Sequence, residues 1–325
     1  MSQQAASWRH PAPTVLLPGA GGSAAVCALK SLRLADYPGR IVATDSDPLA
    51  IGLRFADSGR IVPPASDPGF VASVLALIAE EGVGVVLPTS GFDTRVYAGH
   101  KRQLRDRGVV AAVCDPDAIA DTEDKWRFHR RVHETFPLPR TWRPGDSGIA
   151  FPCFVKPTQG KGSREATRCD DARALALHLN TGQDVLVQEY LPGPEYSVDV
   201  LSDLEANPIV AVPRLRLAIR GGISVKGRVV PDAAIQSLCI AMARFLGLKG
   251  STCMQLKRDG GGQLRFLEVN PRLGGASIFA TLAGVNLPLL LVRLACGEDV
   301  RAPEFRPITV VRYFEELVVE EGDVE

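Results

Sequence analysis

The sequence predicts an α/β region followed by an α+β region. In the first third of the chain, short apolar strands alternate with amphipathic helices, a pattern typical of a parallel, doubly wound sheet. After residue 190, apolar and polar residues alternate with a period of two, and two such runs are joined by a glycine-rich turn, which indicates antiparallel pairing. With 325 residues, of which 46% are apolar, the chain can build the cores of two or three such units.

The first unit is expected to be a Rossmann-like domain over residues 14–114. Residues 1–13 show no apolar period, so they are expected to form a flexible tail. In the rest of the unit, strands are expected at 14–17, 40–44, 83–87 and 109–114, and helices at 23–34, 71–81 and around Lys101.

A second unit is expected over residues 115–190, because Asp115 and Pro116 mark a boundary. Its elements form a small α+β subdomain with a charged linker helix at its start. The expected elements are helices at 121–135 and 171–179 and strands at 151–156 and 185–190.

The third unit is expected over residues 191–325 and contains a larger, mostly antiparallel sheet. From Glu195 onward every second residue is apolar, which predicts a strand. The other expected elements are a helix at 231–246 and a hairpin at 252–269. The turn of that hairpin, residues 259–262, holds an aspartate followed by three glycines.

Composition excludes several classes of partner. Lys plus Arg and Asp plus Glu number 37 each, so no net field attracts nucleic acid or an anionic membrane. The most apolar stretch, residues 278–296, is interrupted by Pro288 and Arg293, which predicts buried helices instead of a membrane span. The seven cysteines contain no close pair, and the first residues lack the apolar core of a signal peptide. A cytoplasmic protein with small-molecule partners is therefore expected.

The most informative polar residues lie at the end of an apolar run. In an extended strand Glu268 and Asn270 point to one face, and Arg272 follows just after a proline. The hairpin brings Gln255 near Glu268 in any symmetric register. Carboxylate and amide oxygens suit Mg²⁺, which shares its shell with substrate phosphates, and an arginine adds charge that phosphate oxygens accept. These residues predict a metal and triphosphate site.

A second group of residues suggests phosphate binding. Lys156 is expected at the end of a strand, and the glycine-rich segment 158–164 follows it. Glycines let backbone amides approach phosphate oxygens closely, and a nearby lysine adds a point charge. The segment is not a Walker loop, because Lys161 lies between the glycines and no helix-opening Gly-Lys-Ser/Thr occurs.

A third group suggests nucleoside binding. Glu189, Tyr190 and Leu191 leave a strand for a stiff Pro-Gly-Pro turn, which could expose backbone donors and acceptors to a purine edge. Six residues after Glu189 comes Glu195, whose carboxylate could accept hydrogen bonds from both ribose hydroxyls.

The order of these parts resembles the ATP-grasp superfamily, specifically its carbamoyl phosphate synthetase-like branch, which includes amino-acid ligases such as the pyrrolysine-biosynthesis ligase. The resemblance runs over most of the chain. It implies an ATP-grasp fold of two α+β subdomains after the Rossmann-like domain. The matching pieces are Asp124 with Lys125, residues 154–157 with the glycine flap, residues 188–191, Glu195, Gln255 and residues 268–272.

The resemblance also implies roles for these residues. The phosphates of ATP would meet Lys125, Lys156 and the flap residues Gly160, Gly162 and Ser163. Adenine would be held by Glu189, Tyr190 and Leu191, and ribose by Glu195. Mg²⁺, with Mn²⁺ as an alternative ion, would be bound by Gln255, Glu268 and Asn270. The transferred phosphoryl group would be stabilised by the catalytic residues Arg272 and Lys156. Arg164 and Glu165 depart from the pattern, since small residues are usual there.

The reaction implied is an ATP-dependent ligation of a carboxylate and an amine. The carboxylate would attack the γ-phosphate to give an acyl phosphate, and the amine would displace phosphate to give an amide or peptide bond. ADP and phosphate would be released, and the substrates would be small molecules such as amino acids. Dimers are common in the family, so a homodimer is also implied.

Two alternatives concern the whole function. The first is an NAD-dependent dehydrogenase, because residues 19–24 match G-x-G-x-x-A and Asp45 follows about 21 residues later, as a ribose-binding acid would. No histidine suited to hydride transfer accompanies that turn, and tight packing of strand against helix explains it as well. The second alternative is a nucleotide-binding protein without catalysis, which a missing metal ligand would have favoured.

Candidate substrate residues are fewer. Asp93, in the loop after the third expected strand, is expected to face the substrate cleft. Arg214, Arg216 and Arg220 approach a Gly-Gly loop and could bind a substrate carboxylate or phosphate. The alternative for the three arginines is an exposed position on a sheet edge.

Overall fold

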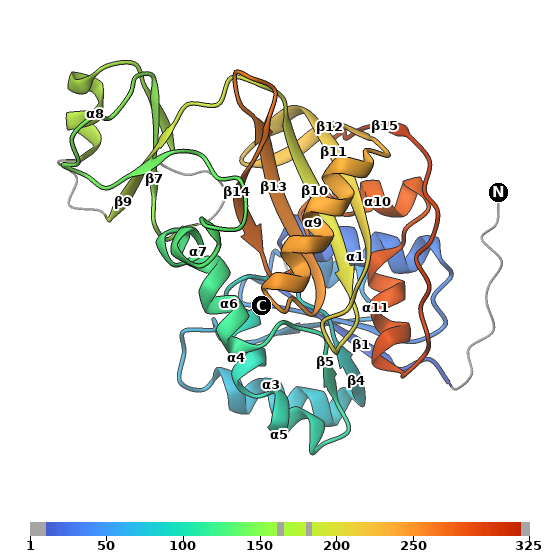
Figure 1. Cartoon of the computed structure of the whole chain (residues 1–325). Coiled ribbons are helices and arrows are strands. Elements are labelled where there is room, and N and C mark those ends of the chain that lie inside the picture. Colours follow the sequence, from blue (N-terminus) through green and yellow to red (C-terminus); the bar gives the residue numbers. More distant parts are fainter. Residues whose placement is uncertain (1–10, 161–165, 180–183, 320–325) are drawn as a thin grey trace.

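Three β-sheets organise the chain. The computed structural model describes residues 11–160, 166–179 and 184–319. A parallel sheet lies at one end of the molecule, a six-stranded sheet forms its middle, and a four-stranded sheet lies at the far corner (Figure 1). Most of the expected amino-terminal tail, residues 1–10, lies outside the described residues.

The amino-terminal sheet has five strands, and each neighbouring pair is parallel. The strand order is β3-β2-β1-β4-β5, so the order of addition reverses between β1 and β4. The strands are β1 (Thr14–Pro18), β2 (Ile41–Asp45), β3 (Ser58–Ile61), β4 (Val83–Val86) and β5 (Val110–Ala111). In open sheets of this kind, ligands bind beyond the carboxyl ends of the strands at the reversal point. Here that point is formed by the loops after β1 and β4.

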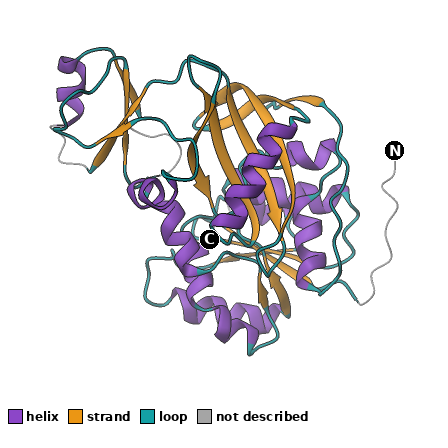
Figure 2. Cartoon of the chain, in the orientation of Figure 1, coloured by secondary structure: helices purple, strands orange, loops and turns teal. Residues whose placement is uncertain are grey.

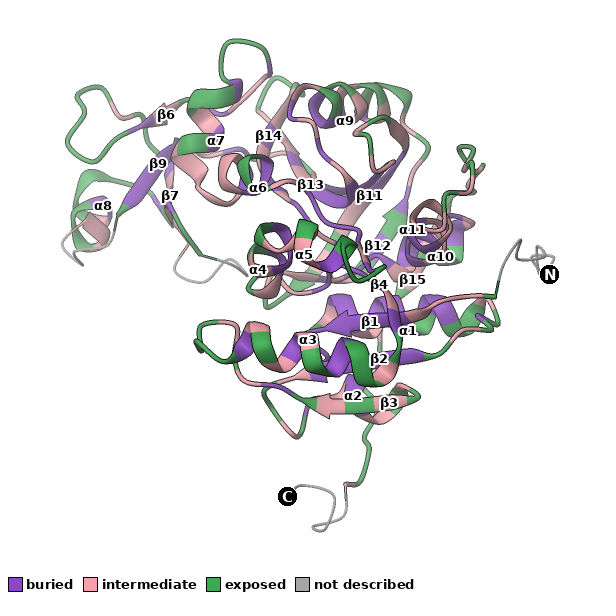
Figure 3. Ribbon diagram, turned by 90° about the horizontal axis from the view of Figure 1, so that it is seen from below, coloured by how far each residue is buried: buried purple, intermediate pink, exposed green. Residues whose placement is uncertain are grey.

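Helices bury both faces of this sheet. Leu16 of β1 packs into a core that includes the third helix, whereas Val15 and Leu17 pack into a core that includes the first helix. Burial on both faces explains why β1, β2 and β4 are mostly apolar, whereas the edge strand β3 is partly exposed (Figure 3). The helices are α1 (Ser23–Leu34), α2 (Ile51–Phe55), α3 (Phe70–Glu81), α4 (Asp93–Gly99) and α5 (Lys101–Arg105).

The four-stranded sheet forms a small unit with its own core. Its order is β6-β9-β7-β8, and neighbouring strands are antiparallel. The strands are β6 (Thr141–Trp142), β7 (Cys153–Pro157), β8 (Thr167–Cys169) and β9 (Val185–Glu189). Helix α8 (Ala172–Leu179) covers one face by packing Leu175 against the buried side chains of Cys153 and Val155. Figure 2 shows this unit standing apart from the larger sheet.

The six-stranded sheet has the order β14-β13-β10-β11-β12-β15 and is antiparallel throughout. The strands are β10 (Glu195–Ser202), β11 (Pro208–Arg220), β12 (Ile223–Val229), β13 (Gly250–Arg258), β14 (Leu264–Asn270) and β15 (Ile308–Val311). Helix α9 (Ala233–Phe245) packs on one face, where Met242 meets Val198 and Met254. The opposite face packs partly against the helices that follow β14, and it also carries Glu195, Gln255 and Glu268, which line a cleft.

The apolar stretch 278–296 forms two short helices, as predicted. They are α10 (Ile278–Ala283) and α11 (Leu287–Ala295), and Asn286 caps the second by accepting from the Leu289 amide. Both helices pack against α1 in the core. Within the described ranges, no helix is both long and apolar enough to cross a membrane.

The predicted single helix over 121–135 is wrong, because the chain breaks it at Asp124. The structure has α6 (Pro116–Glu123) and α7 (Lys125–Val132), with Asp124 in an extended conformation between them. The Asp124 carboxylate caps α7 by accepting from the Arg127 amide at 2.8 Å. The break also lets the Lys125 amide donate to the Thr158 carbonyl at 3.0 Å, which ties α7 to the end of β7.

Candidate active site

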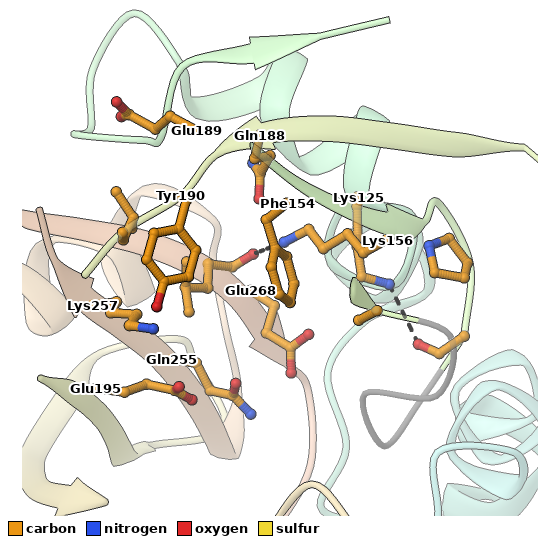
Figure 4. Close-up of a pocket in the computed structure, with 15 residues that line it drawn as sticks. Lys125, Phe154, Lys156, Gln188, Glu189, Tyr190, Glu195, Gln255, Lys257 and Glu268 are labelled. Carbon is orange, nitrogen blue, oxygen red and sulfur yellow. Dashed lines mark hydrogen bonds between the residues drawn. The ribbon is translucent and has the colours of Figure 1, made fainter. Parts of the chain in front are cut away.

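A cleft lies between the four-stranded sheet and the polar face of the six-stranded sheet (Figure 4). Its empty space, including the solvent at the open mouth, is about 840 Å³. Predicted residues from both sheets and from α7 line it: Lys125, Lys156, Gly160, Glu189, Tyr190, Leu191, Glu195, Gln255 and Glu268.

The predicted metal ligands share one face of the β13–β14 hairpin. Gln255, which the sequence placed near Glu268, pairs directly with it, and Asn270 lies two residues further along the strand. The Asn270 amide nitrogen donates to the Glu268 carboxylate at 2.9 Å. This contact turns the Asn270 carbonyl oxygen away from the carboxylate, and no hydrogen bond from the described residues engages that oxygen. A carboxylate with two carboxamide oxygens fits the ligand preference of Mg²⁺.

A β-bulge in the same hairpin supplies a backbone acceptor. Gln255 pairs with Glu268 and Leu256 pairs with Phe266, so Leu267 has no partner across the ladder. The Leu267 carbonyl instead accepts from the Lys156 ammonium at 3.1 Å. The bulge therefore joins the two sheets across the floor of the cleft.

Two lysines face Glu268 from the other side of the cleft (Figure 4). Lys156 is buried, and Lys125 lies at the first turn of α7, where its ammonium donates to the Gly160 carbonyl at 3.4 Å. Burial lowers the pKa of Lys156 to about 8, while the Glu268 carboxylate opposes that shift. Burial also lowers the pKa of Lys125, and Glu268 again opposes it. Both ammonium groups thus lack a direct anionic partner among the described residues, which suits an anionic ligand.

Arg272 lies where the six-stranded sheet meets the parallel sheet. The Leu273 amide donates to the Pro88 carbonyl at 3.0 Å, which places this segment beside the loop after β4. The Arg272 guanidinium donates to the Leu273 carbonyl at 3.0 Å and forms no ion pair with the described residues. A half-buried cation therefore stands at the reversal point of the parallel sheet.

The predicted adenine residues lie at the end of β9. The Glu189 carboxylate accepts from the Arg140 amide at 3.0 Å, so it fixes the strand end. The Tyr190 ring lies between two cations, with the Arg168 guanidinium 4.5 Å and the Lys257 ammonium 5.4 Å from its centroid. These contacts hold the ring at the side of the cleft (Figure 4).

Only part of the predicted glycine flap can be placed. Gly160 lines the cleft with φ +139°, a conformation that favours glycine. Gly162 and Ser163, together with Arg164 and Glu165, lie outside the described residues.

The predicted substrate arginines lie in different surroundings. Arg214 is in the interior, paired with Asp199 at 2.5 Å, so the alternative of an exposed position on a sheet edge is wrong for it. Arg216 is also enclosed and paired with Glu195. Arg220 is exposed at the tip of β11, 5.5 Å from the centroid of the Phe314 ring. Asp93 begins α4 beyond the carboxyl end of β4, and its facing a substrate stays a prediction.

The amino-terminal glycine turn is occupied by its own chain. The Asp45 carboxylate accepts from the Gly21 amide at 2.8 Å and from the Asp47 amide at 3.0 Å. In a dinucleotide site, the backbone amides of the turn would face the pyrophosphate and the acid would face the ribose. Here the acid closes the turn, which favours the packing role over the dehydrogenase alternative.

Several lining residues were assigned no role from the sequence: Phe154, Pro157 and Gln188, which lie within the matching pieces, and Ala166, Lys257 and Leu267. The strand period could have found two of them, because Phe154 shares a face with Lys156 and Lys257 shares a face with Gln255. No sequence signal marked Leu267, since it enters the site through the bulge.

Comparisons with known proteins agree with this geometry. Residues 181–317 match a family model described as ATP-grasp in the biosynthetic pathway with Ter operon. The carbamoyl phosphate synthase large chain of Gemmatimonas aurantiaca is 28% identical over an alignment of 297 residues, and the match covers 84% of this chain and 27% of that protein. The chain thus spans about a quarter of the length of the curated relatives it matches.

Solved structures share the fold. One is the biotin carboxylase domain dimer of Hydrogenobacter thermophilus 2-oxoglutarate carboxylase in complex with MgADP, ADP and bicarbonate. Its TM-score is 0.71 at 18% sequence identity, and the match covers 89% of this chain and 70% of that chain. Another is the ADP complex of N5-carboxyaminoimidazole ribonucleotide synthetase, with a TM-score of 0.71, 15% identity, and coverage of 92% and 81%. The fold class and the resemblance predicted from the sequence are confirmed.

The buried lysine gives a prediction about stability. Lys156→Met should stabilise the protein without nucleotide or metal at pH 7, by on the order of 3 kcal/mol, because the folded state buries a charge that the unfolded state leaves in water. Between pH 8 and 10.5 the unfolded chain binds more protons at this lysine than the folded chain does. The stability of the wild type should therefore rise with pH relative to the variant across that window.

Urea unfolding at pH 7 and pH 9.5 tests this, with the exposed Lys30→Met as the matched control. A wild type that is more stable than Lys156→Met at pH 7, by a margin that does not change with pH, would contradict the buried-charge assignment.

Proposed function

We propose that this chain, which has the ATP-grasp fold and is related to carbamoyl phosphate synthase large chains, is an ATP-dependent carboxylate-amine ligase. One observation carries the proposal: Glu268, Gln255 and Asn270 share a sheet face opposite two lysines that have no direct anionic partner among the described residues. Oxygen ligands and ammonium groups that face each other across a cleft suit a nucleotide triphosphate with its metal.

ATP would lie along the cleft. Adenine would contact Tyr190 and Leu191 at the end of β9, and ribose would face Glu195 on β10. The phosphates would extend toward Lys125 and Lys156. Both lysines would then gain the anionic partner that they lack, and the pKa of Lys156 would rise as a result.

Three side chains would hold Mg²⁺, with Mn²⁺ as an alternative ion: Gln255, Glu268 and Asn270. When bound, the ion would neutralise charge on the phosphates and help to orient them. The donor set fits this role, because the Asn270 amide nitrogen is engaged by Glu268 and its oxygen is left free.

The chemistry would proceed in two steps. An oxygen of the substrate carboxylate would attack the γ-phosphorus of ATP, the bond to the β-phosphate oxygen would break, and an acyl phosphate and ADP would form. The amine would then attack the acyl carbon, phosphate would leave, and an amide would remain. Arg272 would stabilise the charge on the transferred phosphoryl group, and Lys156 would hold the phosphates in line.

The acceptor substrates would bind beside Arg272, beyond the carboxyl ends of β1 and β4. Asp93 and Arg220 are candidates to recognise them, and amino acids are the expected class. Carbamoyl phosphate synthesis is the activity for which the larger relatives are named, and we do not propose it for this chain. A homodimer, expected from the resemblance, also stays a prediction.

A pooled assay tests the function. The protein is incubated with ATP and Mg²⁺ against pools of amino acids and small carboxylic acids, and ADP, AMP and phosphate are separated by chromatography. Pool-dependent ADP and phosphate would support the ligase. AMP with pyrophosphate would contradict the acyl phosphate route, and NADH formation from NAD without ATP would favour the dehydrogenase instead.

The metal assignment predicts that Glu268→Ala lowers pool-dependent ADP formation at least about 100-fold, because the variant removes the one carboxylate of the donor set. Raising the Mg²⁺ concentration should restore part of the rate. Glu205→Ala, at an exposed turn, is the control and should behave as wild type. Near-normal ADP formation by Glu268→Ala would refute the assignment.

The assignment of Arg272 to the transition state predicts a different pattern. Arg272→Lys should lower kcat by about 100-fold while KM for ATP changes less than about threefold, because lysine keeps the charge and loses the forked donor geometry. Steady-state kinetics measure both constants, and the exposed Arg301→Lys provides the control. A large rise in KM with unchanged kcat would place Arg272 in ground-state binding instead.

A further inference from the structure

Arg216 occupies a special position within the site. Its side chain is only 3% exposed, although it stems from the middle of the sheet face that carries the polar residues. One terminal nitrogen donates to Glu195 at 2.5 Å and to Gln255 at 3.2 Å, and the other donates to the Gly222 carbonyl at 2.5 Å. A single guanidinium thus joins β10, β13 and the β11–β12 turn.

A glycine lies opposite Arg216 in the neighbouring strand. Arg216 pairs with Gly227 on β12. A Cβ at Gly227 would meet the Phe279 ring at 2.9 Å, the Leu215 carbonyl at 3.1 Å and the Arg214 side chain at 3.3 Å. A side chain at position 227 would therefore clash with the packed interior, whereas the Arg216 guanidinium is fixed by its hydrogen bonds to Glu195, Gln255 and Gly222.

The contact with Glu195 balances the negative charge of this carboxylate. Glu195 is 21% exposed in the cleft, and its carboxylate would repel the phosphates of a nucleotide if no cation balanced it. Arg216 supplies that cation from behind and engages one carboxylate oxygen. The other oxygen makes no hydrogen bond to the described residues and can accept from ribose hydroxyls.

The contact with Gln255 fixes which end of the carboxamide faces Arg216. A carboxamide has a donor end and an acceptor end of nearly equal shape, so an unrestrained side chain can present either end to a metal. Arg216 has only donors, and therefore it selects the Gln255 oxygen for its own side. A carbonyl oxygen has a second lone pair, which remains available to a cation.

We infer that Arg216 is a positioning residue, which acts through Glu195 on ribose recognition and through Gln255 on the metal, and that it is not a substrate ligand. The inference rests on the proposed function. Lysine could not replace it fully, because one ammonium cannot reproduce the forked geometry that reaches all three acceptors. The role predicts linked changes in nucleotide-sugar selectivity and in metal dependence.

Nucleotide binding tests the inference without needing the unidentified substrates. Calorimetry gives the affinities of ATP and 2′-deoxyATP with Mg²⁺ for the wild type, Glu195→Gln, Arg216→Met and Arg216→Lys. The control is Arg228→Met, an exposed arginine on the neighbouring strand. The second readout is the Mg²⁺ concentration required for half-maximal ATP binding.

The expected result is that Arg216→Met weakens ATP binding about tenfold or more and reduces the preference for ATP over 2′-deoxyATP as far as Glu195→Gln does. It should also raise the Mg²⁺ requirement, which Glu195→Gln should not. Arg216→Lys should recover part of the ATP affinity, because it restores the charge, while the Mg²⁺ requirement stays high. The control should match the wild type.

Three results would overturn the inference. In the first, Glu195→Gln changes the sugar preference, but an Arg216 variant keeps the wild-type sugar preference and the wild-type Mg²⁺ requirement. Arg216 would then have only a structural role. If Glu195→Gln leaves the sugar preference unchanged, the ribose branch fails although ATP binding stands. If the wild type does not bind ATP at all, the proposed function fails and the inference fails with it. Where Arg216→Met does not fold, Arg216→Lys carries the metal readout.

Discussion

The register of the β13–β14 hairpin is the constraint on which the site depends. Direct pairing of Gln255 with Glu268 puts a carboxamide and a carboxylate side by side, and the period of the strand adds Asn270. The bulge that follows frees the Leu267 carbonyl, which then binds Lys156 from the other sheet. A register shift of one residue would turn these side chains to the face that packs on α9. The register that builds the core is therefore also the register that builds the site.

Charge is distributed in the site in two ways. Two arginines outside the cleft lining are balanced by carboxylates: Arg214 pairs with Asp199, and Arg216 pairs with Glu195. The lining residues Lys125 and Lys156 donate to carbonyl oxygens and have no carboxylate within hydrogen-bonding distance among the described residues. Each ion pair offsets part of the desolvation cost of burying its two charges, whereas the two lysines can gain an anionic partner when a ligand binds. This difference distinguishes arginines with a structural role from lysines that we propose bind the ligand.

Much of the fold could be predicted from the sequence because periodicity and turn residues determine it locally. The helix over 23–34 and the hairpin around residues 259–262 follow from local patterns, and they occur as predicted. The break at Asp124 was missed, because a carboxylate cap and a long-range contact to Thr158 decide it. The roles of Leu267 and Arg216 could not be predicted, since a bulge and a three-way contact arise only when distant strands pair.

The central claim is that a nucleotide lies between the two antiparallel sheets and that its metal binds to the β13–β14 hairpin. A crystal structure of the protein with ADP and Mg²⁺ tests it most directly. We expect adenine beside Tyr190, the phosphates between Lys125 and Lys156, and the ion on Glu268 and Asn270. Density for the nucleotide at the glycine turn after β1, with the cleft between the sheets empty, would contradict the account.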